Sequence, residues 1–350
     1  RGAPARLAGR RAAGACRTRA AGGACAMGLL SKLLPKRKQD EPPKLVSFLA
    51  VFTWVNTWLF FPFITFGALW YRLGILYAVG FWGGLGFLAL PRHQKSLVQV
   101  GRAHAPGLRV FICKMRFWID GSEVIGSAAK GSKPALHCHH PHGAVGINGM
   151  SKGGMDTKIK AVVAPLCFRM PLCRQLMEAL GAITSEKRAF QKYMQTGQDF
   201  AILPGGVEEV VLADQDRERI YLKRRKGFIK YALESGYDLV PVYHLGETQL
   251  FRVLWPQTAD WAVRLRLRIA QRTQLAIGIG YGCLWMPNLP RQGEKCITVI
   301  GDRIALPKIE RPTPQDVDKY HALYTASLVE LYNQHRHRLP QYKHKDLEIW

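Results

Sequence analysis

The sequence predicts an α/β fold, a central sheet flanked by helices, preceded by an N-terminal membrane hairpin. Three observations predict it: a long uncharged apolar run near the N-terminus, short apolar runs that alternate with helical patterns beyond residue 92, and a content of 48% hydrophobic residues. Strands that alternate with helices are typical of layered α/β architectures. A chain of 350 residues suits one main domain with an appendage.

The first region, residues 1–44, is basic and is expected to be disordered. Residues 1–39 carry ten Lys and Arg and no Asp or Glu. The chain begins with Arg1, and its first methionine is Met27, so residues 1–26 are either a transit peptide or translated upstream sequence. We favour the second interpretation, because patterns typical of folded structure begin only after Met27.

The second region, residues 45–91, is predicted to be a membrane hairpin. No charged residue interrupts the run Leu45–Tyr71, and a second uncharged run, Leu73–Leu90, follows Arg72. About 20 apolar residues suffice to cross a bilayer. Lys and Arg flank the pair on both outer sides, which places both ends in the cytosol. A re-entrant hairpin in one leaflet and a buried core helix are the alternatives.

The formal net charge of +25 raises the question of nucleic-acid binding. No nucleic-acid recognition motif accompanies the charge, whereas a long apolar run does. Anionic membrane surfaces attract Lys and Arg by about 1 kcal/mol for each residue near the headgroups. We therefore expect membrane lipids, and no nucleic acid, as partners. The eight cysteines form no C-x-x-C pair, which indicates reduced thiols and a third region, residues 92–350, that faces the cytosol.

Short apolar runs in this third region predict strands, and amphipathic runs predict helices. The strands are expected at Ala135–Cys138, Lys160–Ala164, Phe200–Leu203 and Leu239–Tyr243. The helices are expected at Pro171–Leu180, at Lys226–Ser235 before Gly236, and after an N-cap at Thr313 with Pro314 in first position and Asp316 in third.

A histidine cluster follows the first of these strands. The segment reads His137-Cys138-His139-His140-Pro141-His142-Gly143. Histidine can accept a proton near neutral pH, as a general base must, and Gly143 lets a substrate approach without meeting a Cβ atom. A zinc site built on the His and Cys side chains and a covalent nucleophile at Cys138 are the alternatives. Neighbouring strand residues point to opposite faces, which disfavours the metal site.

A glycine pair and two carboxylates follow the third strand. The segment runs from Phe200 through Gly205-Gly206 to Glu208-Glu209. Glycines permit backbone geometries that expose N–H groups to an oxyanion, and a carboxylate placed after the turn could orient a histidine. A strand-to-loop junction with solvated Glu side chains is the alternative. Basic residues at Arg169 and at Arg224-Arg225-Lys226 before Gly227 could hold phosphate groups, or could simply face water.

Together these motifs resemble the type 2 diacylglycerol acyltransferase family, which also includes monoacylglycerol and wax-alcohol acyltransferases. The matching pieces, in order, are His140-Pro141-His142-Gly143, Phe168-Arg169-Met170-Pro171, Gly205-Gly206 with Glu209, Arg225-Lys226-Gly227-Phe228, Asp238–Tyr243 and Gly246-Glu247. The resemblance runs from about Pro134 to the C-terminus. It implies a glycerolipid-acyltransferase-like sheet in residues 92–350, and a location at the endoplasmic reticulum membrane or the lipid-droplet surface.

The resemblance also implies the roles of individual residues. It places catalysis at His140 and His142 with Glu209 as partner, and we expect His142 to be the base, with His140 as the alternative. Substrate and oxyanion contacts are expected at Pro141, Gly143, Gly205 and Gly206, and acyl-CoA contacts at Arg169, Arg225, Lys226 and Gly227. Glycerolphosphate acyltransferases have an Asp five positions after a His; Val145 and Ile147 stand there, so the carboxylate is expected to come from Glu209.

The expected reaction esterifies diacylglycerol with the acyl group of acyl-CoA. Acyl-CoA is a co-substrate, and we expect neither a metal nor another cofactor nor a covalent intermediate, because the thioester is already activated. Monoacylglycerol or a fatty alcohol is the alternative acceptor. A non-catalytic lipid-droplet surface protein and a zinc hydrolase are alternatives of other classes. The sequence leaves acyl-chain preference and homo-oligomer formation open.

Overall fold

A seven-stranded sheet forms the centre of the computed structural model. The strands follow the order β1 (Glu123–Ile125), β10 (Ile297–Ile300), β7 (Asp238–Leu245), β2 (Ala135–His140), β5 (Phe200–Ile202), β3 (Lys160–Val163) and β4 (Ile183–Thr184). Neighbouring strands are parallel except for β10 and β7. The expected α/β architecture with a central sheet is confirmed.

The structure describes only part of the chain. Described are residues 42–56, 67, 69–71, 74–88, 111–112, 114–121, 123–127, 131–149, 159–170, 173–253, 259–276 and 280–350. The predictions for residues 1–41 lie outside this set. From Pro42 to Trp350 the chain forms one compact unit.

The four strands predicted from apolar runs are all present, with shifted ends. β2 continues two residues further than expected, through His139 and His140, and every residue of β2 is buried. β7 is also longer than expected and is buried throughout. A strand that is covered on both faces can contain polar residues only where they have hydrogen-bonding partners. A search for apolar runs does not detect such partners, so it ended these strands too early.

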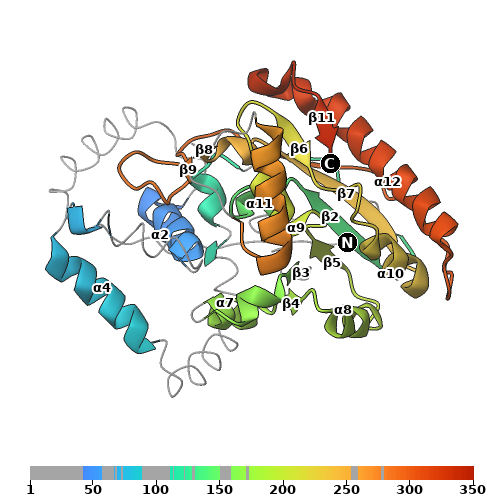
Figure 1. Ribbon diagram of the computed structural model, residues 1–350, viewed down its shortest axis with the longest axis horizontal. Helices are drawn as coiled ribbons and strands as arrows, with labels where there is room; N and C mark the ends of the chain where they lie inside the picture. The colour runs from blue at the N-terminus through green and yellow to red at the C-terminus, as the bar shows by residue number, and fades with distance from the viewer. Residues whose placement is uncertain are drawn as a thin grey trace, which may run out of the picture. The chain divides into compact units, whose positions relative to one another are not determined.

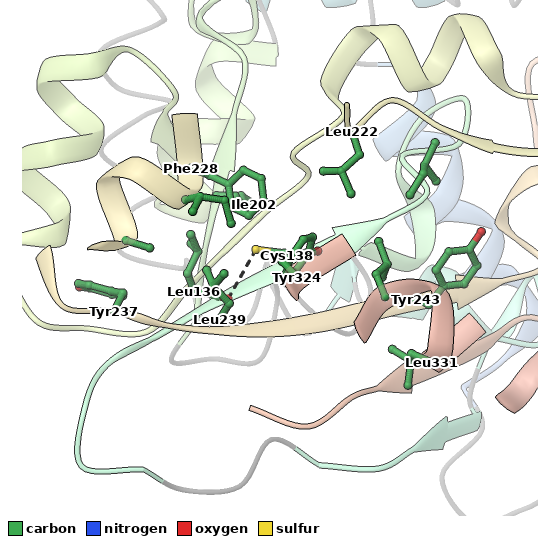
Figure 2. Close-up of a cluster of buried hydrophobic side chains, with 14 of the residues drawn as sticks. Leu136, Cys138, Ile202, Leu222, Phe228, Tyr237, Leu239, Tyr243, Tyr324 and Leu331 are labelled. Atoms are coloured by element: carbon green, nitrogen blue, oxygen red, sulfur yellow. Dashed lines mark hydrogen bonds between the residues drawn. The ribbon is translucent and has the colours of Figure 1, made fainter. Parts of the chain in front are cut away.

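Helices α10 (Gly227–Ser235) and α12 (Pro314–His335) cover one face of the sheet (Figure 1). Their side chains meet the strands in one large apolar cluster, to which α8 (Lys187–Met194) adds Phe190 and Met194. Figure 2 shows Tyr324 of α12 beside Cys138 of β2 within this cluster. The dense cover on this face excludes solvent from the strand residues beneath it.

The ends of these helices agree with the sequence. Thr313 and Asp316 form a reciprocal capping box, with the Thr313 hydroxyl accepting from the Asp316 amide at 3.1 Å. Gly236 ends α10 in the left-handed region, at φ +73°. The third predicted helix is α7 (Cys173–Leu180); Pro171 and Leu172 lie outside the described residues.

A second apolar cluster covers the other face of the sheet. Successive side chains of β3 point to opposite faces of the sheet: Ala161 belongs to this second cluster, and Val162 belongs to the cluster beneath α12. The second cluster includes side chains of α2 (Lys44–Asn56), of the 3-10 helices η1 (Lys114–Phe117) and η3 (Pro165–Phe168), and of α7.

The expected hairpin is described only in part. α2 buries Ala50, Val51 and Val55 in the second cluster but exposes Leu45 and Leu49. All described side chains of α4 (Ile75–Leu88) are exposed. Within the described residues, no helix combines the length and the apolar character needed to cross a bilayer. Residues 57–66 and 89–110 lie outside that part of the chain.

Smaller elements surround the carboxyl ends of β2, β5 and β7. α9 (Gly206–Leu212) follows β5 and packs against α11 (Asp260–Thr273) (Figure 1). β6 (Glu218–Ile220) pairs with β11 (Leu347–Ile349), and β8 (Arg252–Val253) pairs with β9 (Gly280–Tyr281). The 3-10 helix η4 (Glu247–Gln249) follows β7, and η5 (Arg336–Arg338) and η6 (Pro340–Tyr342) follow α12.

A buried hydrogen-bond network centred on Glu218 ties these small elements to the sheet. The Glu218 carboxylate accepts from the Tyr243 hydroxyl at 2.7 Å and from the Thr248 hydroxyl at 2.9 Å. Tyr342 lies 2.8 Å from the Thr248 hydroxyl and accepts from the Gly246 amide. The network therefore fixes the turn that follows β7. Burial raises the pKa of Glu218 to about 7.

Replacing Glu218 should make stability less dependent on pH. The unfolded state releases the Glu218 proton near the ordinary value of 4.5, and the folded state near 7. Between these values the folded state holds more protons, so the free energy of unfolding falls as pH rises, by up to about 1.4 kcal/mol per pH unit for one group. We expect Glu218→Gln to reduce this slope between pH 5 and 7, measured by denaturant unfolding in detergent. Glu330→Gln, an exposed change on α12, is the control; equal slopes in all three proteins would contradict the assignment.

Candidate functional site

The histidine cluster lies where β2 leaves the sheet. β2 ends at His140, the His140–Pro141 peptide is cis, and Pro141 is buried. β5 and β7, the parallel neighbours of β2, end at the same edge. In open α/β sheets, ligands bind beyond the carboxyl ends of the strands. The fold thus brings the histidine motif and the Gly-Gly segment to one edge.

His140 and Glu209 form a fully buried pair. Nδ1 of His140 lies 2.8 Å from Oε1 of Glu209, and neither side chain is exposed to solvent. Glu209 belongs to the first turn of α9, so the solvated-loop interpretation of this segment is wrong. A Cβ atom on Gly205 would overlap the carboxyl group of Glu209. Gly205 is therefore required to make room for the carboxylate.

Glu209 holds His142 through the backbone rather than through the ring. Its Oε2 accepts from the His142 amide at 2.8 Å, and its Oε1 also accepts from the Tyr221 amide at 3.2 Å. The expected contact between Glu209 and the imidazole of His142 is not formed. The reason is the longer β2: strand alternation sends the ring of His140 toward α9, and His142 lies beyond the strand.

The ring of His142 is oriented by its own loop. Nδ1 lies 3.1 Å from the carbonyl oxygen of Gly143 and can only donate to it, which leaves Nε2 unprotonated when the ring is neutral. Burial lowers the pKa of His142 from its ordinary value. Gly143 has φ +62°, a region that favours glycine. A neutral ring with a free Nε2 is the form that a general base requires.

His142 lines a cavity of about 810 Å³. Apolar side chains form much of its wall, among them Met170, Phe190, Leu203, Phe228 and Tyr231. His140 and Cys138 do not line it. The size and the apolar wall suit a ligand with a hydrocarbon chain.

Charged side chains also belong to the cavity wall. Arg224, Arg225 and Gly227 line it, and Arg225 forms an ion pair with the buried Glu208. The other expected acyl-CoA contacts lie elsewhere: Lys226 donates to Asp318 of α12 at 2.6 Å. The Arg169 side chain is 75% exposed and lies 3.9 Å from Glu186.

The Gly-Gly segment contributes less to an oxyanion site than expected. Gly206 lines the cavity at φ +58°, but its amide donates to the Leu203 carbonyl at 3.1 Å. That amide is therefore engaged within the turn.

Glu247 is a site residue that was not predicted. Its two carboxylate oxygens accept from the amides of Ile147 and Asn148, each at 2.9 Å, and Glu247 lines the cavity. A Cβ atom on Gly143 would lie 2.5 Å from Cγ of Glu247, so the two residues are in close contact. Burial raises the pKa of Glu247 to about 7. Two signals were available in the sequence: its position directly after the buried strand β7, and its place in the matching piece Gly246-Glu247.

The other members of the histidine cluster have separate partners. His139 lies 2.8 Å from His244 on β7, and burial holds the pKa of His139 well below its ordinary value. His137 faces Asp199 at 4.0 Å. Burial raises the pKa of the Cys138 thiol, which disfavours the thiolate that a nucleophile requires. Among the described residues, no group of three or more His, Cys, Asp and Glu side chains is arranged to hold a metal ion.

Comparison with curated proteins finds relatives with one shared name, Diacylglycerol O-acyltransferase 2. The protein from Xenopus tropicalis is 30% identical over 235 residues, covering 62% of this chain and 65% of the relative. The protein from Danio rerio is 31% identical over 224 residues (59% and 62%), and that from Dictyostelium discoideum is 28% identical over 244 residues (65% and 74%). The chain spans somewhat under two thirds of the length of the first two relatives.

Among solved structures, the 1-acyl-sn-glycerophosphate acyltransferase PlsC from Thermotoga maritima aligns with a TM-score of 0.39 and 12% identity. The alignment covers 83% of this chain and 97% of that one. A TM-score of this size does not establish a common fold. Residues 130–350, more than half of the chain, match the family described as Diacylglycerol acyltransferase. The chain belongs to the diacylglycerol acyltransferase family, as its motifs predicted.

Proposed function

We propose that the chain transfers the acyl group of acyl-CoA to the free hydroxyl of diacylglycerol. The observation that carries this proposal is the position of His142: its ring lines a largely apolar cavity, and its Nδ1 is engaged by the Gly143 carbonyl. Family membership and the names of the relatives support the substrate pair.

In the proposed reaction, Nε2 of His142 takes the proton of the acceptor hydroxyl. The hydroxyl oxygen attacks the thioester carbonyl, and the tetrahedral oxyanion collapses with cleavage of the C–S bond. The imidazolium then returns its proton to the CoA sulfur. A general base contributes about 10²–10⁴-fold. The lowered pKa of His142 favours release of the proton in the second step. Neither a metal nor a covalent intermediate is required.

His142 is a better candidate for the base than His140. The His140 ring is fully buried, pairs with Glu209 and is not part of the cavity wall, so an acceptor hydroxyl in the cavity does not meet it. Glu209 acts as a positioning residue, because it holds the His142 amide and the His140 ring at once. The Gly206 amide already donates a hydrogen bond within its own turn. We therefore assign stabilisation of the oxyanion to the backbone amides near Gly143 and Gly205.

The cavity wall offers partners for both kinds of substrate group. Its apolar wall suits the acyl chain, and Arg224 and Arg225 suit the phosphates of CoA. We further propose attachment to the endoplasmic reticulum membrane or the lipid-droplet surface, with residues 92–350 in the cytosol. The net charge of +25 and the exposed apolar side chains of α4 support contact with membrane lipids.

Loss of His142 or Glu209 should abolish acyl transfer. We expect His142→Ala and Glu209→Ala each to lower the rate of triacylglycerol formation by at least about 10²-fold, because each removes the base or its alignment. The assay uses membranes that lack neutral-lipid synthesis, supplied with labelled acyl-CoA and diacylglycerol. His344→Ala and Glu330→Ala, both exposed, are the matched controls. Full activity in the His142 variant would end the mechanism.

Replacing Glu247 should lower kcat more than it changes KM. Glu247→Gln keeps the size of the side chain but presents an NH₂ group to one of the two amides, so one hydrogen bond to the 147–148 turn is lost. The loop that orients His142 would then hold its ring less well, and small misplacements of a catalytic group can cost about 10²-fold. Steady-state kinetics at pH 7 measure the two constants. A raised KM with unchanged kcat would instead assign Glu247 to substrate binding.

The acceptor is tested by offering diacylglycerol, monoacylglycerol and a fatty alcohol in parallel. We expect the highest kcat/KM with diacylglycerol, because the relatives carry that name. Preference for either other acceptor would keep the chemistry and change the substrate. No transfer to any acceptor by the folded, membrane-bound chain would favour a non-catalytic lipid-surface protein.

A further inference from the structure

One face of helix α11 is buried against the rest of the fold. Ala262, Val263, Leu267 and Ala270 are buried, and three of them pack against Val211 and Leu212 of α9 and their neighbours. Arg266, also buried, lines the cavity. The chain that follows the helix, Gln274–Ala276, lines the cavity as well. The inner side of α11 is therefore part of the cavity wall.

The outer face of α11 is exposed and combines two chemistries. Trp261 is 73% exposed and Leu265, one turn later, is 47% exposed. Arg264, Arg268 and Arg272, spaced by four residues, are exposed on the same side. Two large apolar side chains are thus flanked by a row of three cations.

Acidic side chains neutralise little of the positive charge of these arginines. Arg264 lies 3.9 Å from Asp260 on the same helix. Within the described part of the chain, neither Arg268 nor Arg272 has an ion-pair partner. An exposed helix with Arg on one side and Trp and Leu beside it is the pattern of helices that lie in the membrane interface. An anionic lipid surface complements both the charge and the apolar side chains.

We infer that the outer face of α11 rests on the surface of a bilayer that contains anionic lipid. Trp261 and Leu265 would enter the headgroup region, and Arg264, Arg268 and Arg272 would contact lipid phosphates. A second copy of the chain is a poorer occupant, because a symmetric pairing would bring the same three arginines together. In this position α11 lies between the lipid and the cavity. That the cavity thereby receives its substrates next to the lipid rests on the proposed function; the contact of α11 with lipid does not.

Spin labels can measure the depth of this face directly. A spin label is attached to the cysteine that Trp261→Cys or Leu265→Cys introduces. Cys16, Cys25 and Cys113 are changed to Ser so that they do not take up the label. The matched control is Leu323→Cys on α12, where the side chain is also 47% exposed. The labelled chains are reconstituted without substrate into vesicles of phosphatidylcholine with or without phosphatidylserine. Accessibility to oxygen and to a water-soluble nickel chelate is compared by power saturation.

We expect the labels at 261 and 265 to favour oxygen over the chelate, and the label at 323 to favour the chelate. The double change Arg268→Glu, Arg272→Glu should reduce the lipid-exposed population by at least about tenfold in anionic vesicles, since each arginine contributes about fivefold to partitioning. Labels at 261 and 265 that match position 323 would overturn the inference. So would dipolar broadening that disappears on dilution with unlabelled chain, which would identify a second copy. Because no substrate is present, failure of acyl transfer is a separate result.

Discussion

The carboxylate of Glu209 is the group on which the geometry of the site depends. It accepts hydrogen bonds from the His142 and Tyr221 amides and pairs with the His140 ring, in a place that solvent does not reach. A buried carboxylate is costly unless several donors surround it. Here the donors come from the end of β2 and from the segment after β6. Removing the carboxylate would leave them unpaired and release the histidine motif.

A second buried carboxylate holds the same loop at its other end. Glu247 binds the 147–148 amides, so the loop from His140 to Asn148 is fixed by one glutamate from α9 and another from the turn after β7. The Glu218 network in turn fixes that turn through Thr248 and Tyr342. Two strands that are neighbours of β2 thereby place the loop, and the loop places the ring of His142. This is why a loop rich in glycine can still present one defined imidazole to the cavity.

The sequence predicted the strands and the histidines well, because burial and motif spacing are local properties. It named His142, His140 and Glu209, and the fold brings all three to one edge of the sheet. It paired Glu209 with the wrong ring, since the choice depends on whether β2 stops before or after His140. Glu247 was noted only as part of the matching piece Gly246-Glu247, and its role was not predicted because it comes from amides about a hundred residues away. Long-range partners of this kind leave no periodic signal in the chain.

The cavity wall combines many apolar side chains with a few charged ones. Glu209 is not part of the cavity wall, whereas His142 and the buried Glu247 line a cavity whose wall is largely apolar. A permanently charged base in that wall would carry a larger desolvation cost against an apolar chain than a neutral imidazole does. In the proposed reaction its proton comes from the acceptor hydroxyl, and its charge exists only between the two proton transfers. Arg224 and Arg225 belong to the same wall, so the proposed acyl-CoA would meet both apolar side chains and cations in this cavity.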